Sequence, residues 1–319
     1  MSWYVDAIPP FLVKFFARPY VSGDSLAMAV RAAEDLLARR SLLTTLDLLA
    51  ENIHTDAEVQ GIVQAYEAMI DTLAGARALQ ESAVGKPTFS IKPSSFTTAP
   101  LEKGGDARGS GERVRALLER ARQRGVSATI DMEDRHWTDW TLELARSAWD
   151  AGMRHVGIVL QTRLNRTRAD LDTLPAGLRV RLVIGIYVEP AEVAIADKRQ
   201  MKERLLEYGK LLLQRGHYLE FATHDEATVR RFLTEVVPAT GAKADQFEVQ
   251  MLYGVPRDAF FAELRAGKVG SVGPVRSRLY VPYALSWSKA IAYLRRRLRE
   301  NPGMALQVMK NLPGKLLGR

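Results

Sequence analysis

Eight compact apolar segments alternate with amphipathic helical patterns along the 319 residues, and this alternation predicts an α/β protein closed into a (βα)8 TIM barrel. Apolar strands separated by helices are typical of a parallel sheet that is covered on its outer face. No Ser/Gly linker or shift in composition divides the chain. The spacing of the strands is irregular, so an open doubly wound sheet is the alternative.

The predicted strands are runs rich in apolar and β-branched residues, such as "LLTTLDLL". In chain order they cover 42–49, 87–94, 127–133, 154–161, 179–187, 217–223, 246–252 and 277–283. The predicted helices repeat apolar residues every three or four positions, and a glycine such as Gly125 closes them. They cover 24–40, 55–80, 111–125, 138–152, 168–174, 197–215, 226–237, 256–267 and the segment around 293–301.

Three segments follow from this pattern. Residues 1–40 form an N-terminal helical segment, 41–301 the barrel, and 302–319 a basic, amphipathic C-terminal helical tail. The first 23 residues mix apolar and basic side chains and contain Pro9 and Pro10, so we interpret them as a docking segment rather than a signal peptide. No apolar run of about 18 residues occurs, and we expect a cytoplasmic protein.

The composition excludes several classes of chemistry. Without cysteine, the chain forms no disulfide, thiolate nucleophile or Cys-ligated zinc site. The five histidines form no HxH or HExxH motif, which disfavours a histidine metal site. The net charge is +8, but no Lys/Arg tract is interleaved with aromatic residues, so we expect no nucleic-acid partner. No glycine-rich phosphate loop matches GxGxxG or GxxxxGKS.

Polar residues gather where the predicted strands end, which is where barrels carry their active sites. They are Lys92, Asp131, Glu133, Gln161, Thr223, His224 and Tyr280, and Arg181 is placed to point into the barrel mouth. Each has a simpler explanation as a solvated loop residue or a helix cap. Together they predict a site, because converging buried charges need partners and often mark function.

The stretch "YLRRRLREN" places Tyr293, Arg296, Arg297 and Glu300 on one helical face. If this helix crosses the barrel mouth, the two arginines present forked donors that suit a carboxylate. The alternative is a basic face in solvent.

Nine ordered motifs then resemble the proline dehydrogenase family, in its monofunctional bacterial form, over about residues 20–312. They are "TLDLLAE", "SIKPSSF", "IDMED", "IVLQTRLNRT", "RLVIGIYVEPAEVAIADK", "YLEFATHDE", "FEVQMLYGV", "RLYVPY" and "YLRRRLREN". The resemblance implies a distorted (βα)8 barrel that uses FAD to oxidise L-proline, or a related cyclic amino acid, to 1-pyrroline-5-carboxylate. It also implies a quinone-type electron acceptor, for which the basic termini either contact a membrane or simply pack on the barrel.

The resemblance also assigns residue roles. It implies that Asp131 and Arg181 are catalytic, with Arg181 beside the reactive flavin nitrogen. The residues implied to line the substrate pocket are Lys92, Leu252, Tyr280, Tyr293, Arg296 and Arg297, of which the last two hold the carboxylate. The residues implied to contact FAD are Met132, Gln161, Arg181, Ile184, Gly185, Ile186, Thr223 and His224.

The chain departs from the family pattern at three positions. The usual strand RLVKGAY reads here "RLVIGIY", so Ile184 replaces a lysine and Ile186 an alanine, and Ala284 replaces a glycine. We therefore expect a working flavin site with a changed substrate preference or rate. Two alternatives are a ligand-binding relative that has lost activity, and a lyase or aldolase that uses Lys92 as a Schiff-base amine.

Overall fold

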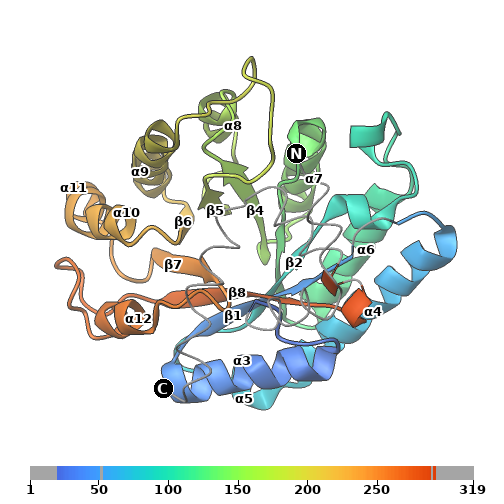
Figure 1. Ribbon diagram of the computed structural model, residues 1–319, viewed down its shortest axis with the longest axis horizontal. Coiled ribbons are helices and arrows are strands. Elements are labelled where there is room, and N and C mark those ends of the chain that lie inside the picture. The colour runs from blue at the N-terminus through green and yellow to red at the C-terminus, as the bar shows by residue number, and fades with distance from the viewer. Residues whose placement is uncertain (1–19, 51–52, 289, 292–319) are drawn as a thin grey trace.

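The computed structural model describes residues 20–50, 53–288 and 290–291, and it contains the predicted barrel (Figure 1). Every strand pairs in parallel with the next, and β8 returns to pair with β1, so the sheet is closed and the open-sheet alternative is wrong. The strands are β1 Leu43–Leu48, β2 Thr88–Ile91, β3 Ser127–Ile130, β4 Val156–Gln161, β5 Arg179–Val183, β6 Tyr218–Ala222, β7 Phe247–Leu252 and β8 Ser277–Tyr283.

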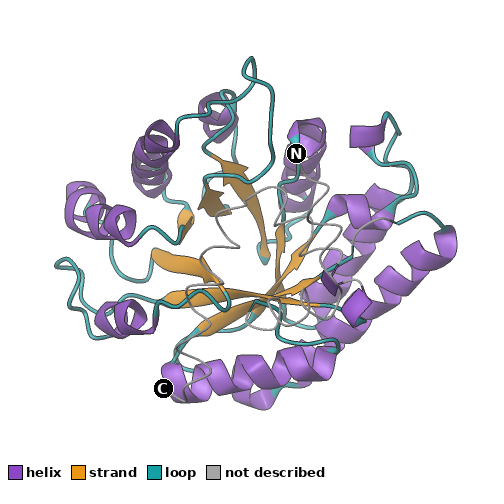
Figure 2. Cartoon of the chain, viewed as in Figure 1, coloured by secondary structure: helices purple, strands orange, loops and turns teal. Residues whose placement is uncertain are grey.

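Helices surround the strands as an outer layer (Figure 2). The α-helices are α3 Leu26–Arg40, α4 Asp56–Gly75, α5 Arg77–Gln80, α6 Ser110–Gln123, α7 Thr138–Asp150, α8 Thr167–Asp172, α9 Lys198–Gln214, α10 Glu226–Arg231, α11 Val237–Thr240 and α12 Asp258–Arg265. A π-helical turn, Phe232–Val236, joins α10 to α11. Short 3₁₀ turns cover Pro93–Phe96, Leu101–Lys103 and Arg135–Trp137.

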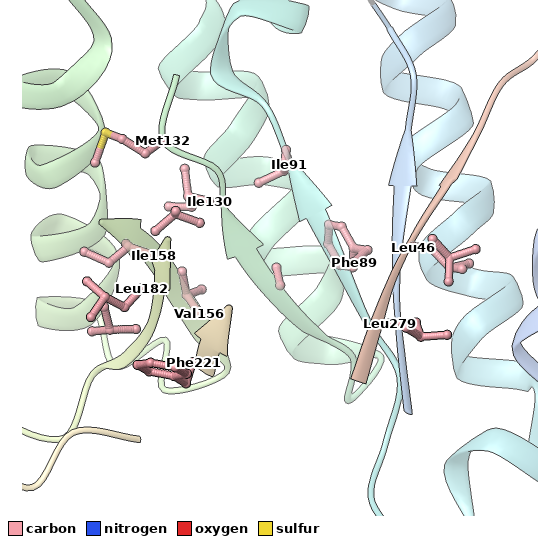
Figure 3. Packing of buried hydrophobic residues seen from close by; sticks show 14 of the residues in the cluster. Leu46, Phe89, Ile91, Ile130, Met132, Val156, Ile158, Leu182, Phe221 and Leu279 are labelled. Carbon is pink, nitrogen blue, oxygen red and sulfur yellow. The ribbon is translucent and has the colours of Figure 1, made fainter. Parts of the chain in front are cut away.

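The core lies between the strands and these helices. Alternate strand residues such as Leu46, Phe89, Leu182 and Phe221 point outward and are fully buried there (Figure 3). Burying each such side chain stabilises the fold by roughly 1.5–3 kcal/mol. The remaining strand positions face the barrel interior, so that interior is free to carry polar side chains.

Three predicted strands end earlier than expected. β2 stops at Ile91 because Pro93 starts a 3₁₀ turn, a position where a missing N–H costs little. β3 stops at Ile130, and β5 stops at Val183 because Gly185 adopts a φ of +96°, which leaves the extended region.

The predicted helices need two corrections. The helix expected over 55–80 is divided at Ala76, whose ψ of 81° is not helical. The helix expected over 226–237 changes to π geometry at Phe232. The helix expected around 293–301 and the tail 302–319 lie outside the described residues.

Candidate functional site

Four polar side chains, two from β5 and β8 and two from the residues just after β2 and β3, meet inside the barrel. Arg181 Nη1 donates to Asp131 Oδ1 at 3.0 Å, and the Tyr280 hydroxyl donates to Asp131 Oδ2 at 2.7 Å. Lys92 Nζ lies 3.0 Å from the Tyr280 oxygen and 3.3 Å from Asp131 Oδ2. Lys92 and Asp131 are each 9% exposed and Arg181 4%. Residues predicted from separate motifs therefore form one buried cluster, which we call the mouth cluster.

Local structure explains how two of these residues reach the interior. Lys92 follows the last residue of β2, and Asp131 follows the last residue of β3. Asp131 N–H donates to the carbonyl of Ile91 at 2.9 Å, which continues the β2–β3 ladder one step. The helix-cap explanation for Asp131 is wrong, because Asp134 caps the following turn.

The structure adds three residues to this cluster that we did not predict. Asp47, in β1, forms a buried ion pair with Lys92. Ser90 Oγ donates to Asp131 Oδ1 at 3.0 Å, and Gln250 Oε1 accepts from Arg181 Nε at 2.8 Å. An acid inside the apolar run "TLDLL" was a usable signal for Asp47, because a buried carboxylate requires a partner.

A second polar layer lies closer to the amino ends of the strands, and we call it the base layer. Arg278 donates from Nε and Nη2 to the two oxygens of Glu248, and its Nη1 donates to the carbonyl of Thr44 at 2.9 Å. The Tyr218 hydroxyl donates to Glu248 Oε2 at 3.0 Å. Glu220 lies between Arg181 and Arg179, with ion-pair distances of 3.1 and 3.4 Å.

Charges in the two layers balance. The acids Asp47, Asp131, Glu220 and Glu248 face the bases Lys92, Arg179, Arg181 and Arg278. Buried charges are costly unless each has a partner. Each of the eight side chains therefore has a partner of opposite sign inside the barrel.

Protonation states in the mouth cluster follow from burial and these partners. Burial raises the pKa of Asp131, but the positive charges of Lys92 and Arg181 outweigh it and the net shift is downward. Burial lowers the pKa of Lys92, yet Asp47 and its other neighbours hold it well above its usual value. Burial and the Asp131 charge raise the pKa of Tyr280. The cluster is therefore a carboxylate, an ammonium and a neutral phenol, and a charged Lys92 is not a Schiff-base nucleophile.

Glu133, two residues after Asp131, has a pKa that is shifted in the opposite direction. Its two carboxyl oxygens accept from the backbone and hydroxyl of Ser94, at 2.9 and 2.5 Å. Burial is the largest cause and raises the pKa of Glu133 to about 7, although the hydrogen bonds from Ser94 and the charge of Lys92 act to lower it. Its backbone carbonyl accepts from Gln161 Nε2 at 2.7 Å.

Two predicted cofactor residues, Gln161 at the end of β4 and Gly185 just after β5, lie in close contact. A Cβ on Gly185 would lie 2.4 Å from Gln161 Oε1, and the positive φ of Gly185 also favours glycine. Gln161 is 3% exposed, and its Oε1 has no hydrogen-bond partner among the described residues. Arg181 Nη2 is also buried and has no hydrogen-bond partner among the described residues. Buried polar atoms without partners mark a place where a ligand can bind.

The two isoleucines that depart from the family pattern lie just beyond β5. The Ile184 carbonyl accepts from Arg163 N–H at 3.0 Å, and its side chain is half-buried. Ile186 is 44% exposed at the rim. Ala284, the third departure, is fully buried beside Val21 and Leu49.

Met132 points away from the barrel interior. Its side chain packs in the apolar layer near Ile130 and Ile158 (Figure 3). Any contact from Met132 to a ligand in the mouth therefore comes from its backbone. Strand alternation was the signal for this, since a residue next to the inward Asp131 faces outward.

Thr223 and His224 follow β6 at the rim. Thr223 Oγ1 accepts from Asp225 N–H at 3.2 Å, and Asp225 rather than His224 caps α10. Leu252, half-buried at the end of β7, donates its N–H to His224 Nε2 at 2.8 Å. Burial and Arg257 lower the pKa of His224 to about 4. His224 is exposed to solvent as a residue, but its Nε2 accepts a hydrogen bond from the backbone. An imidazole nitrogen that accepts a hydrogen bond carries no proton, so the ring is neutral.

The predicted carboxylate clamp, Arg296 and Arg297, lies outside the described residues, and so does the predicted pocket residue Tyr293. Within the described ranges, no cluster of three His, Cys, Asp or Glu side chains could hold a metal ion. Nor does any helix in that part of the chain have the length and apolarity to cross a membrane.

Known proteins resemble this chain over most of its length. The family model described as proline dehydrogenase matches residues 29–310. The proline dehydrogenase of Deinococcus radiodurans is 34% identical over 306 residues, covering 93% of this chain and 89% of the relative. Proline dehydrogenase 1 of Bacillus subtilis strain 168 is 31% identical over 300 residues, covering 93% of this chain and 90% of the relative.

Solved structures support the fold. Proline utilization A of Bdellovibrio bacteriovorus superimposes with a TM-score of 0.78 at 21% identity, covering 90% of this chain and 33% of that one. A variant of the Bradyrhizobium japonicum protein of the same name gives 0.71 at 20% identity, covering 89% and 30%. At such identities the likeness concerns the barrel alone. On the family match and the two relatives, the chain is an oxidoreductase and belongs to the proline dehydrogenase family.

Proposed function

We propose that the chain oxidises L-proline, or a closely related cyclic amino acid, to 1-pyrroline-5-carboxylate with bound FAD, and that a quinone-type acceptor takes the electrons. The observation that carries this proposal is the mouth cluster. It places a charged Lys92, an ionised Asp131 and the Tyr280 hydroxyl beside Arg181 at the carboxyl ends of the strands.

The residues near the mouth fit a flavin. Arg181 Nη2 and Gln161 Oε1 are buried polar atoms without partners among the described residues, and the absence of a side chain on Gly185 allows close approach there. When bound, FAD supplies the hydride acceptor. The residues that would hold it are Gln161, Arg181, Ile184, Gly185, Ile186, Thr223, His224 and the backbone of Met132. Arg181 contributes fixed positive charge on one side of this place.

The mouth cluster prepares the substrate electrostatically. An amine must be neutral before it gives up hydride, and the charged Lys92 lowers the pKa of an ammonium placed beside it. Asp131 already accepts hydrogen bonds from Arg181, Ser90 and Tyr280, so its oxygens are committed. Its role is therefore to hold Arg181 and Tyr280 in place rather than to remove a proton.

Arg296 and Arg297 complete the proposal as the grip on the substrate carboxylate, with Tyr293, Leu252 and Tyr280 lining the pocket. Two guanidinium groups match a carboxylate in geometry as well as in charge. This part rests on the sequence pattern and the family resemblance.

The direct test is colour. Protein purified with added FAD is expected to be yellow and to bleach when L-proline is added without oxygen. A short-chain quinone should restore the colour, and vesicles of anionic lipid should sediment with the protein if the basic termini contact a membrane. Protein that takes up no FAD would overturn the proposal.

Ile184 and Ile186 favour a second candidate, a family member with altered substrate or lost activity. The larger side chain at position 186 removes space, and the chain lacks the lysine expected at 184. A panel of proline, hydroxyprolines, pipecolate and N-methylated analogues separates the two. Yellow protein that no imino acid bleaches would support the second candidate.

A further inference from the structure

Gln250 occupies a position in the barrel that the proposed reaction does not use. It is 2% exposed in β7, and its amide makes two hydrogen bonds. Its Oε1 accepts from Arg181 Nε at 2.8 Å, and its Nε2 donates to Glu248 Oε1 at 2.6 Å. Since a carboxylate only accepts and a guanidinium only donates, these two partners fix which way the amide points.

Two buried atoms near Gln250 lack hydrogen-bond partners among the described residues. They are Arg181 Nη2 and Glu220 Oε1. Glu220 Oε2 accepts from Arg181 Nε at 3.1 Å, whereas its Oε1 is reached by Arg179 Nη1 at 3.4 Å without hydrogen-bond geometry. Nε and Nη2 form one side of a guanidinium, and that side usually takes both oxygens of a carboxylate. Arg181 and Glu220 could therefore satisfy each other fully, yet they do not.

The contacts around Arg181 explain why. The N–H of Arg181 Nε is shared between Gln250 and Glu220, and Asp131 and Ser90 both accept from Arg181 Nη1 at 3.0 Å. These contacts hold the guanidinium turned away from a two-point pair with Glu220. As a result Nη2 keeps its hydrogen-bonding capacity for something else.

We infer that Gln250 is a positioning residue, which with Glu248 behind it prevents Arg181 from closing onto Glu220 and keeps Nη2 available to a ligand. The inference rests on the proposed function in one respect, that this ligand is the flavin. Removing the Gln250 amide should let Arg181 and Glu220 form the two-point pair, which withdraws positive charge from the mouth.

The test compares Gln250→Met with wild type. Methionine has a similar length but neither holds Nε nor donates to Glu248. A crystal structure without cofactor should show Arg181 Nη2 bonded to Glu220 Oε1. In FAD-loaded protein, affinity for sulfite, which leaves negative charge on the flavin, should fall by about tenfold, because one hydrogen bond from a charged donor is lost.

Two further variants control the result. Gln246→Met makes the same change at an exposed position just before β7 and should alter neither measurement. Gln250→Glu is the conservative variant. Its carboxyl keeps an acceptor for Arg181 Nε in the place of the amide oxygen, so its crystal structure should show Arg181 Nη2 unpaired with Glu220, as in wild type.

An Arg181 that stays in place in Gln250→Met, or an unchanged sulfite affinity with only lower thermal stability, would overturn the inference. If that variant does not fold, Gln250→Asn is measured in the same way, since its shorter amide cannot reach both partners. Wild-type protein that takes up no FAD would reject the proposed function, while the crystal structures still decide the position of Arg181.

Discussion

The mouth cluster and the Arg278–Glu248 pair of the base layer are both charged and buried, yet they differ in how completely their hydrogen bonds are satisfied. In the base layer, Arg278 uses Nε, Nη1 and Nη2 within the barrel, and Glu248 accepts on both oxygens. In the mouth, Arg181 Nη2 and Gln161 Oε1 have no partner in the described part of the chain. The saturated Arg278–Glu248 pair holds the barrel together, whereas the unpaired atoms of the mouth, together with Glu220 Oε1, leave hydrogen-bonding capacity unused.

The largest effect is expected in the base layer, on stability. Arg278→Met leaves Glu248 as an uncompensated buried charge, so the free energy of unfolding should fall by roughly 3–5 kcal/mol. Denaturant unfolding measures this. Arg168→Met, which removes an exposed helical pair with Asp172, should cost less than about 1 kcal/mol. Equal losses in both variants would contradict the structural role of the base layer.

The next effect is expected in the mouth, on turnover. Asp131→Asn removes the charge that Arg181 and Lys92 share, and kcat/KM for the preferred substrate should fall by roughly 10²–10³. Asp139→Asn, at an exposed pair with Arg166, should leave turnover unchanged. If Asp131→Asn lowered stability but not kcat/KM, the mouth cluster would be structural in the same sense as the base layer.

Within the mouth itself, Asp131 and Glu133 are two residues apart, and the pKa of Asp131 is lowered while that of Glu133 is raised from 4.5 to about 7. A carboxyl with a raised pKa favours the folded state at low pH. Its contribution to stability is therefore lost as pH rises from 4.5 to 7. Asp131 acts in the opposite sense, because its contribution is present above pH 4 and is lost on acidification.

Glu133→Gln tests this contrast. The amide keeps one acceptor for the Ser94 N–H and can donate to the Ser94 hydroxyl, but it does not ionise. Relative to wild type, its free energy of unfolding should rise between pH 5 and pH 8 by on the order of 2–3 kcal/mol. Denaturant unfolding across this range checks it, and a difference that does not change with pH would show that Glu133 stays ionised.

The sequence predicted the strands of the barrel better than it predicted the side chains that meet inside it. Strand β8 lies where the pattern 277–283 predicts, and apolar runs also located the other strands, because the outer face of each strand is buried by helices. Lys92 and Asp131 were identified because each directly follows a strand, and Tyr280 was identified within the predicted eighth strand. Asp47 and Gln250 were missed because they lie inside apolar strands, and the bases that they contact, Lys92 and Arg181, come from other parts of the chain. Linear spacing does not reveal which side chains meet inside a barrel.

The smallest effect is expected at Asp47. This residue lies within β1 and forms an ion pair with Lys92 of the mouth cluster. In Asp47→Asn, Lys92 keeps Asp131 as a charged neighbour at 3.3 Å, so the ammonium still has a partner. We therefore expect kcat/KM to fall by only about tenfold, equivalent to one hydrogen bond between charged groups. Steady-state kinetics measure this against Asp139→Asn. A loss as large as that of Asp131→Asn would instead mean that Asp47 sets the charge of Lys92, and that the mouth depends on the Asp47–Lys92 pair more than on Asp131.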